Sequence, residues 1–176
     1  PRLLKTEWGS SLEEICQGEL VDDCKVRIIS GSVLYGRKAD AEAGYLGRFH
    51  NQISVIEEDT HRELFGWQMP GFDKHSVTRL FLSFMLPFKK FDMTSNTHGS
   101  PRAFVPIGNF EKIMPLDMMA SPLVKALLSN DVEMAIKLGV LELDEEDLGL
   151  FNYVCPGKTD YGPLLRDMLT YIEKEG

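Results

Sequence analysis

The chain contains few cysteines: only Cys16, Cys24 and Cys155 occur in its 176 residues. A small, odd number of cysteines argues against a disulfide framework and predicts a reducing, cytoplasmic environment. Long apolar runs are scarce too. The longest, residues 80–88, is about half the ~20 residues that a membrane-spanning helix needs, and it contains Pro87. We therefore expect no membrane-spanning segment in this sequence.

A basic surface is also missing from the sequence. The formal net charge is −8, and residues 131–176 hold 11 Asp and Glu against 4 Lys and Arg, while residues 1–130 hold 16 against 15. Nucleic acids and anionic lipids favour basic surfaces, because basic side chains displace their counterions. The sequence therefore predicts no nucleic-acid partner, and an acidic C-terminal part that is either solvated or faces a basic partner.

Motifs for catalysis, nucleotides and metals are absent. The sequence contains neither G-x-G-x-x-G nor G-x-S-x-G. GSVLYGRK (31–38) departs from the phosphate-binding loop at its last two positions, where Arg37 replaces the lysine and Lys38 lacks a hydroxyl. The four histidines show no H-x-H or H-x3-H spacing. We predict no catalytic residue and no metal site, and we interpret the glycines of this stretch as turn residues.

One Cys-Pro pair suggests redox chemistry. Bacterial ferredoxins place cluster ligands at C-x2-C-x2-C-x3-C-P. Counting back from Cys155, those ligands would occupy positions 145, 148 and 151, which hold Glu145, Leu148 and Phe151. A cluster with the usual four ligands therefore cannot form at this position. We interpret Cys155 as a structural cysteine.

The N-terminal half has mostly strand signals. KVRII (25–29) is a short strand candidate, and residues 51–67 suggest two strands around an acidic turn. A helix is predicted after Ser11, which pairs with Glu14 as a capping box. The apolar run 77–86 has the composition of either a buried strand or a helix. We predict a small sheet with one helix against it.

The C-terminal part has helical periodicity. Ser121-Pro122 predicts a helix start, with Leu123, Val124, Leu127 and Leu128 on one face. Further helices are predicted from Asn130, from Asp144 and after Tyr161. Four short amphipathic helices would form a small bundle.

Long phrases of the chain resemble a known family. These phrases are VRIISGSVLYGR (26–37), YLGRFHNQISVIEE (45–58), RELFGW (62–67), VPIGNFEKIMPLD (105–117) and residues 138–176. They are similar to the C-terminal part of the A subunit of the sodium-translocating NADH:quinone reductase, and the resemblance covers nearly the whole chain.

The resemblance implies an α+β fold. A small β-grasp domain of the soluble-ligand-binding type, with extra strands, would occupy residues 1–100, and a helical domain residues 101–176. The chain, which begins without Met, would be a fragment of a peripheral subunit on the cytoplasmic side of the bacterial inner membrane. The complex it resembles oxidises NADH, reduces ubiquinone, transports Na⁺, and uses NAD, flavins and an iron-sulfur centre. We expect none of these cofactors in the fragment itself.

Two functions follow from this resemblance. The first is docking and assembly with the other subunits of the reductase, together with contact to ubiquinone. The alternative is direct binding of a soluble ligand by the β-grasp part. We expect ligand or partner contacts to come from aromatic and basic residues, with His50 the main candidate for a partner contact. The candidates are Tyr35, Arg37, Tyr45, Arg48, His50 and Trp67.

Overall fold

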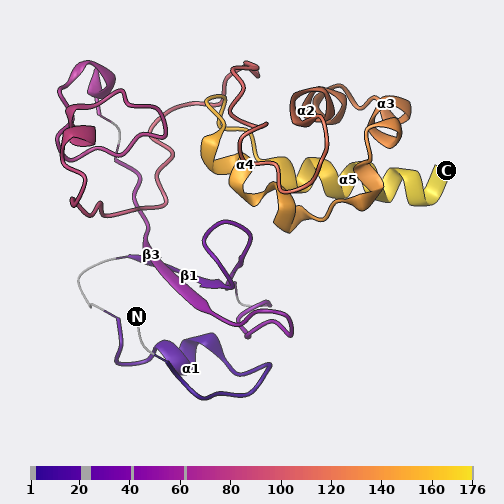
Figure 1. The fold of residues 1–176 in the computed structure, drawn as a ribbon. Coiled ribbons are helices and arrows are strands. Elements are labelled where there is room, and N and C mark those ends of the chain that lie inside the picture. The colour runs from indigo at the N-terminus through magenta and orange to yellow at the C-terminus, as the bar shows by residue number, and fades with distance from the viewer. Residues whose placement is uncertain (1–2, 21–24, 41, 62, 176) are drawn as a thin grey trace. The chain divides into compact units, whose positions relative to one another are not determined.

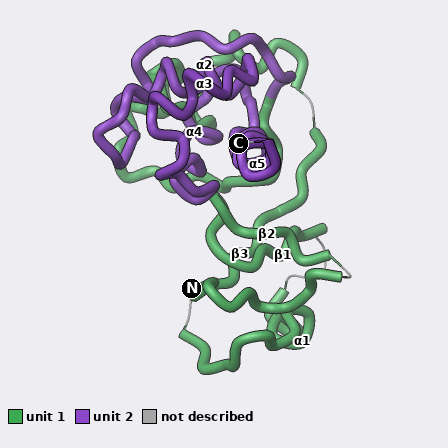
Figure 2. Tube along the Cα trace, turned by 90° about the vertical axis from the view of Figure 1, so that its right-hand side faces the viewer, with its two compact units in different colours: residues 1–98 green, residues 99–176 purple. Residues whose placement is uncertain are grey.

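The computed structural model describes residues 3–20, 25–40, 42–61 and 63–175. Cys24, one of the three cysteines considered above, lies outside these ranges. The chain forms two compact units, residues 1–98 and residues 99–176 (Figure 2). The regular elements run in the order α1 (Leu12–Cys16), β1 (Val26–Ser30), β2 (Arg37–Lys38), β3 (Ile53–Glu57), η1 (Gly66–Gln68), η2 (Leu82–Met85), α2 (Ala120–Ser129), α3 (Val132–Lys137), η3 (Val140–Glu142), η4 (Glu145–Leu148), α4 (Gly149–Val154) and α5 (Tyr161–Glu175), where η marks a 3-10 helix (Figure 1).

The first unit is built on an antiparallel sheet with the strand order β2-β1-β3. Strand β1 pairs with β3 along its full length, so that Ile28 faces Val55, and it pairs with β2 through Ile29 and Ser30. The strand predicted at 25–29 is therefore confirmed with a shift of one residue. A bidentate contact from Arg27 in β1 to Glu58 just after β3 (2.7 and 2.5 Å) ties the two strands together.

Helix α1 is short and is capped as the sequence predicts. The Ser11 side chain accepts a hydrogen bond from the Glu14 backbone N–H (3.4 Å). Leu12 and Cys16 are buried, and Ile15 is half-buried. Burial by the surrounding chain, together with the nearby Glu19 carboxylate, raises the pKa of the Cys16 thiol. Cys16 is therefore a core residue of this unit.

The second unit is helical and contains the larger apolar core. Its centre is aromatic: Phe110 stacks on Phe151 with ring centroids 5.1 Å apart, and Tyr161 meets Phe110 edge-on at 5.9 Å. All three side chains are fully buried. The predicted helical region is confirmed as α2, α3, η4 with α4, and α5.

Several local predictions for these helices were wrong. Helix α2 begins after Met119, not at Ser121. Asn130 does not start the next helix; it ends α2 in the left-handed conformation (φ 52°), and Asp131 caps α3. Leu128 is 39% exposed and lies off the buried face.

Two predictions in the first unit were also wrong. Residues 63–67 form turns and part of η1 instead of a second strand. The run 77–86 is neither a buried strand nor an α-helix, because only the 3-10 helix η2 forms there and most of its side chains are exposed. Local apolar content indicated burial, but the apolar side chains point outward.

The fold is therefore mixed α and β, with a three-stranded antiparallel sheet and a separate helical unit among the described residues. Assignment of the sheet to the β-grasp type stays a prediction, as does the exact domain division. In the described part of the chain, no helix combines the length and the apolar character needed to cross a membrane.

Candidate functional site

A long loop leaves the sheet after β3 and returns to it. The two ends of this loop, which we call its neck, are joined by a parallel bridge between Glu57 and Thr94 and by a hydrogen bond from the Ser95 N–H to the Glu57 carbonyl (2.9 Å). We call residues 63–93 the apolar lobe (Figure 1). Loops of this length with little regular structure are uncommon in compact domains and are usually either functional or linker and disordered segments.

Asp59 strengthens the neck. Its carboxylate accepts hydrogen bonds from the His61 backbone N–H (2.7 Å) and from the Asn96 side-chain amide (3.2 Å). These donors, with the His61 N–H the largest cause, hold the pKa of Asp59 below its ordinary value. The two ends of the lobe are therefore held side by side by polar contacts.

Lys74 organises the interior of the apolar lobe. Its ammonium pairs with Glu63, donates to the Gly66 carbonyl (3.1 Å) and lies 6.0 Å from the centroid of the Phe81 ring. Its own carbonyl accepts a hydrogen bond from the Ser83 hydroxyl (2.5 Å). One lysine thus joins the start of the lobe to its middle.

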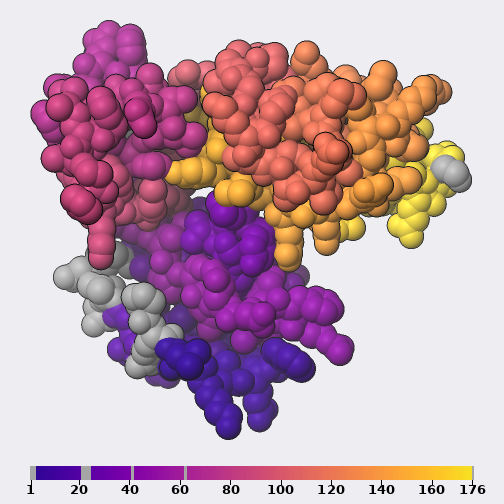
Figure 3. Space-filling model, in the orientation of Figure 1, coloured from indigo at the N-terminus to yellow at the C-terminus, as the bar shows by residue number. Residues whose placement is uncertain are grey.

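The apolar lobe leaves most of its large apolar side chains exposed. Within it the buried residues are Gly71 and Ser83, while Phe88 is 95% exposed and Leu80 76%. The exposed large apolar side chains of the lobe, which covers part of the surface in Figure 3, are Leu64, Phe65, Trp67, Met69, Phe72, Val77, Leu80, Leu82, Phe84, Met85, Leu86, Phe88 and Met93. Exposure of so many large apolar side chains within one segment is typical of an interaction surface.

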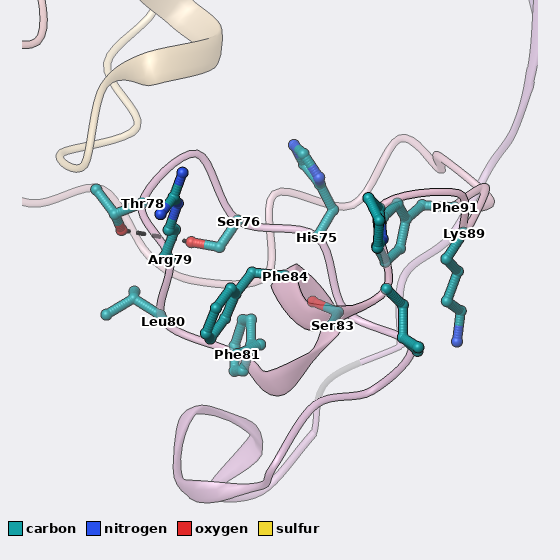
Figure 4. Close-up of a pocket in the computed structure, with 12 residues that line it drawn as sticks. His75, Ser76, Thr78, Arg79, Leu80, Phe81, Ser83, Phe84, Lys89 and Phe91 are labelled. Carbon is teal, nitrogen blue, oxygen red and sulfur yellow. Dashed lines mark hydrogen bonds between the residues drawn. The ribbon is translucent and has the colours of Figure 1, made fainter.

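The lobe also contains a hollow of about 200 Å³ (Figure 4). Leu80, Phe81 and Phe84 form an apolar wall, and Arg79 and His75 supply polar groups. The aromatic ring of Phe91 lies 5.4 Å from the His75 ring. The hollow therefore combines apolar walls with hydrogen-bond donors.

A second, more open groove of about 590 Å³ lies beside the N-terminal segment. It is lined by residues 3–6, Trp8, Leu46, His50 and Asn51. His50 is held in place by a hydrogen bond between its Nδ1 and the hydroxyl of the fully buried Ser30 (2.7 Å), which also accepts from the Gly47 N–H (3.0 Å). The hydrogen-bonded pair of Ser30 and His50, which we call the clasp, fixes the loop before β3.

The six residues predicted for ligand or partner contact are spread over the first unit. Tyr35 and Arg37 are exposed on the β1–β2 turn and on β2, Tyr45 and Arg48 are exposed before β3, His50 lines the groove, and Trp67 lies in the apolar lobe. None of the six lines the lobe hollow, and among them only His50 lines the groove. Their role in binding stays a prediction.

The rest of the apolar lobe was not predicted from the sequence. The signal was available in the run 77–86, whose apolar side chains are followed by Pro87 and two lysines. Such a composition fits a protein core as well as a contact surface, so that only the observed exposure distinguishes the two.

Cys155 lies in the core of the second unit. Its Sγ is 3.1 Å from the Tyr161 hydroxyl, and the thiol is 6% exposed. Burial, followed by the contact with Cys155, raises the pKa of Tyr161 well above its ordinary value, so the phenol stays protonated. Leu148 and Phe151, at two positions where a ferredoxin has cysteine, are fully buried apolar residues. The residues around Cys155 do not suit an iron-sulfur cluster.

A mixed α and β fold with a large exposed apolar lobe is the class of structure expected of a component of a larger assembly. Comparison with known proteins shows what the chain is similar to. Residues 1–41 match the family model described as the NQRA C-terminal domain. The A subunit of the Na(+)-translocating NADH-quinone reductase is 55% identical to this chain in Rhodopirellula baltica, 56% in Shewanella frigidimarina and 54% in Hahella chejuensis, over all 176 residues.

Along its whole length the chain is therefore similar to A subunits of the Na(+)-translocating NADH-quinone reductase, as the resemblance of its phrases predicted. It spans 39% of the length of each of these relatives.

Proposed function

We propose that this chain is the docking and assembly part of the A subunit in a sodium-translocating NADH:ubiquinone reductase. It acts as a peripheral component on the cytoplasmic side of the bacterial inner membrane and has no complete catalytic site of its own. The observation that carries the proposal is the identity of more than half of its residues with the relatives named above, along its whole length.

We extend the proposal to cofactors: the fragment holds none, and NAD, flavin and iron-sulfur chemistry belong to other parts of the complex. The support is the surroundings of Cys155, where the thiol contacts the Tyr161 hydroxyl and the neighbouring positions are filled by buried Leu148 and Phe151. A cluster would need thiolates at positions that serve the apolar core.

Purification of the reductase tests this function directly. With an affinity tag on another subunit, we expect this chain to be retained in a fixed ratio through size-exclusion chromatography in detergent. A reductase that assembles fully, oxidises NADH and reduces ubiquinone without any retained chain would contradict the proposal.

One observation favours contact with ubiquinone as well. The lobe hollow offers an apolar wall at Phe81 and Phe84 beside Arg79 and His75, and a quinone ring needs apolar faces and donors to its carbonyl oxygens. Titration of the chain with a short-chain ubiquinone, followed by Trp67 fluorescence in a Trp8→Phe background, should give saturable quenching. Equal quenching in an Arg79→Ala, Phe84→Ala variant would count against a specific site.

The alternative, a free-standing module that binds a soluble ligand, has less support. The six aromatic and basic candidates do not converge on one pocket, and the relatives are named as subunits of a complex.

A further inference from the structure

From the apolar lobe we infer a specific docking surface: residues 64–88 bind another subunit of the reductase, through a facing surface that is apolar at its centre and carries carboxylates at its rim. This inference rests on the proposed function and adds the place of contact and the chemistry of the partner. The observation behind it is the exposure of the apolar side chains of the lobe, among them Leu80 and Phe88, while its buried residues are Gly71 and Ser83.

The exposed apolar area is large enough for a stable interface. Trp67 is 73% exposed, Leu80 76%, Met85 65% and Phe88 95%. At roughly 150–250 Å² for a whole aromatic side chain, Trp67, Phe84 and Phe88 together expose about 300–550 Å². Leu64, Leu80 and Met85 add to this area. One side of a standard protein–protein interface buries about 800 Å². The lobe alone could therefore supply most of one partner's contact.

The aromatic and methionine content of the lobe, though not its three lysines and three acidic residues, is typical of an interface centre. Tryptophan, phenylalanine, methionine and arginine are enriched at such centres, and acidic residues and lysine are depleted. Exposed aromatic residues also dominate the energetics of interfaces when they enter pockets on the partner. Phe88, which extends almost fully into solvent, is the main candidate for such an anchor.

The charges indicate a protein partner rather than a lipid surface. Four Lys and Arg of the lobe stand against three Asp and Glu. Two of the lysines already have internal contacts, since Lys74 pairs with Glu63 and Lys89 donates to the Phe72 carbonyl (2.8 Å). Anionic membranes attract clusters of several basic residues, and this lobe lacks one. Exposed Arg79, and Lys90 just beyond residues 64–88, are instead suited to pair with individual carboxylates at a rim.

The lobe is organised before it binds. The closed neck between Glu57 and Thr94 and the contacts of Lys74 fix the backbone without burying the apolar side chains. A preformed surface loses less conformational entropy on association than a disordered segment does. The lobe also leaves β3 at the end opposite His50 and Asn51, which line the groove of the N-terminal segment. The described N-terminal residues therefore do not cover it.

A pair of double variants tests the inference in the assembled complex. Leu80→Ser, Phe88→Ser removes two exposed anchors, and Leu141→Ser, Tyr171→Ser removes two exposed apolar side chains of the helical unit, which are 59% and 55% exposed. Each chain is produced together with the remaining subunits, and the complex is purified through a tag on another subunit. We expect retention of the lobe variant to fall at least tenfold, and retention of the control variant to match the wild type. Equal retention of both variants would overturn the inference.

Three further readouts identify what covers the lobe. If the wild-type chain itself is not retained, the proposed function fails and not only the docking surface. If the lobe variant lowers the melting temperature of the isolated, full-length protein, the lobe packs inside that protein and the inference is overturned. If the wild-type chain sediments with phosphatidylglycerol vesicles and the lobe variant does not, while both are retained in the complex, the lobe contacts lipid and the inference is again overturned.

Discussion

Substitution of Gly71 should disrupt the apolar lobe. Gly71 is buried and has φ +63°, a conformation that L-residues rarely adopt. A Cβ at this position would lie 2.4 Å from Cδ1, 2.7 Å from Cγ and 3.0 Å from Cβ of Phe81. Because the stem of Phe81 is involved as well as its ring, rotation of the ring alone cannot relieve the clash.

The expected magnitude has two parts. The left-handed conformation costs an alanine roughly 1–2 kcal/mol, and forcing extra volume into a packed site costs about 1–3 kcal/mol. Gly71→Ala should therefore destabilise the lobe by roughly 2–5 kcal/mol. Gly18 provides a matched control, since it has φ +76° and no atom within 4 Å of the position of an added Cβ. Gly18→Ala should therefore cost only the roughly 1–2 kcal/mol of the left-handed conformation.

Urea unfolding followed by the fluorescence of Trp67, in a Trp8→Phe background, measures the effect where it should occur. We expect a clearly lower midpoint for Gly71→Ala than for Gly18→Ala. Equal midpoints for the two variants would refute the packing of Gly71 against Phe81, and with it the ordered interior of the lobe.

Three other substitutions test the rest of the structure. Phe151→Ala should lower the free energy of unfolding by about 3–5 kcal/mol, measured in urea, because the ring lies in the aromatic core. Contact with Arg166 lowers the pKa of Glu145 from 4.5 to about 2. The pair therefore stabilises the fold above pH 4.5, and this contribution is lost as the pH falls toward 2. In Arg166→Gln, the melting temperature should fall less between pH 4.5 and pH 2 than in the wild type. Ser30→Ala should cost about 1–3 kcal/mol and release His50, which hydrogen exchange of residues 45–51 would detect as faster exchange.

Much of the helical unit could be predicted from the sequence because its signals are local. Leu123, Val124 and Leu127 recur at helical spacing and are buried in α2. The error at Asn130 arose because both Asn130 and Asp131 can cap a helix, and the sequence alone does not show that Asn130 adopts the left-handed conformation that ends α2. The three-stranded sheet was predicted in part, with β1 and β3 placed correctly.

The apolar lobe could not be predicted, for a physical reason. A run such as residues 77–86 has the same composition whether it fills a core or covers a contact surface. The conformation in which this run is exposed contains contacts that are not local in sequence, such as those of Lys74 with Gly66 and Ser83. The clasp between Ser30 and His50 likewise joins residues 20 positions apart and has no signature in spacing.

Hydrogen exchange of the full-length protein, measured free and within the purified reductase, would show whether the apolar lobe is covered by another subunit. We expect peptides covering residues 80–88 to exchange substantially more slowly in the complex, while peptides covering the exposed end of α5 are unchanged. If residues 80–88 exchange equally fast in the free protein and in the complex, the lobe is not a docking surface.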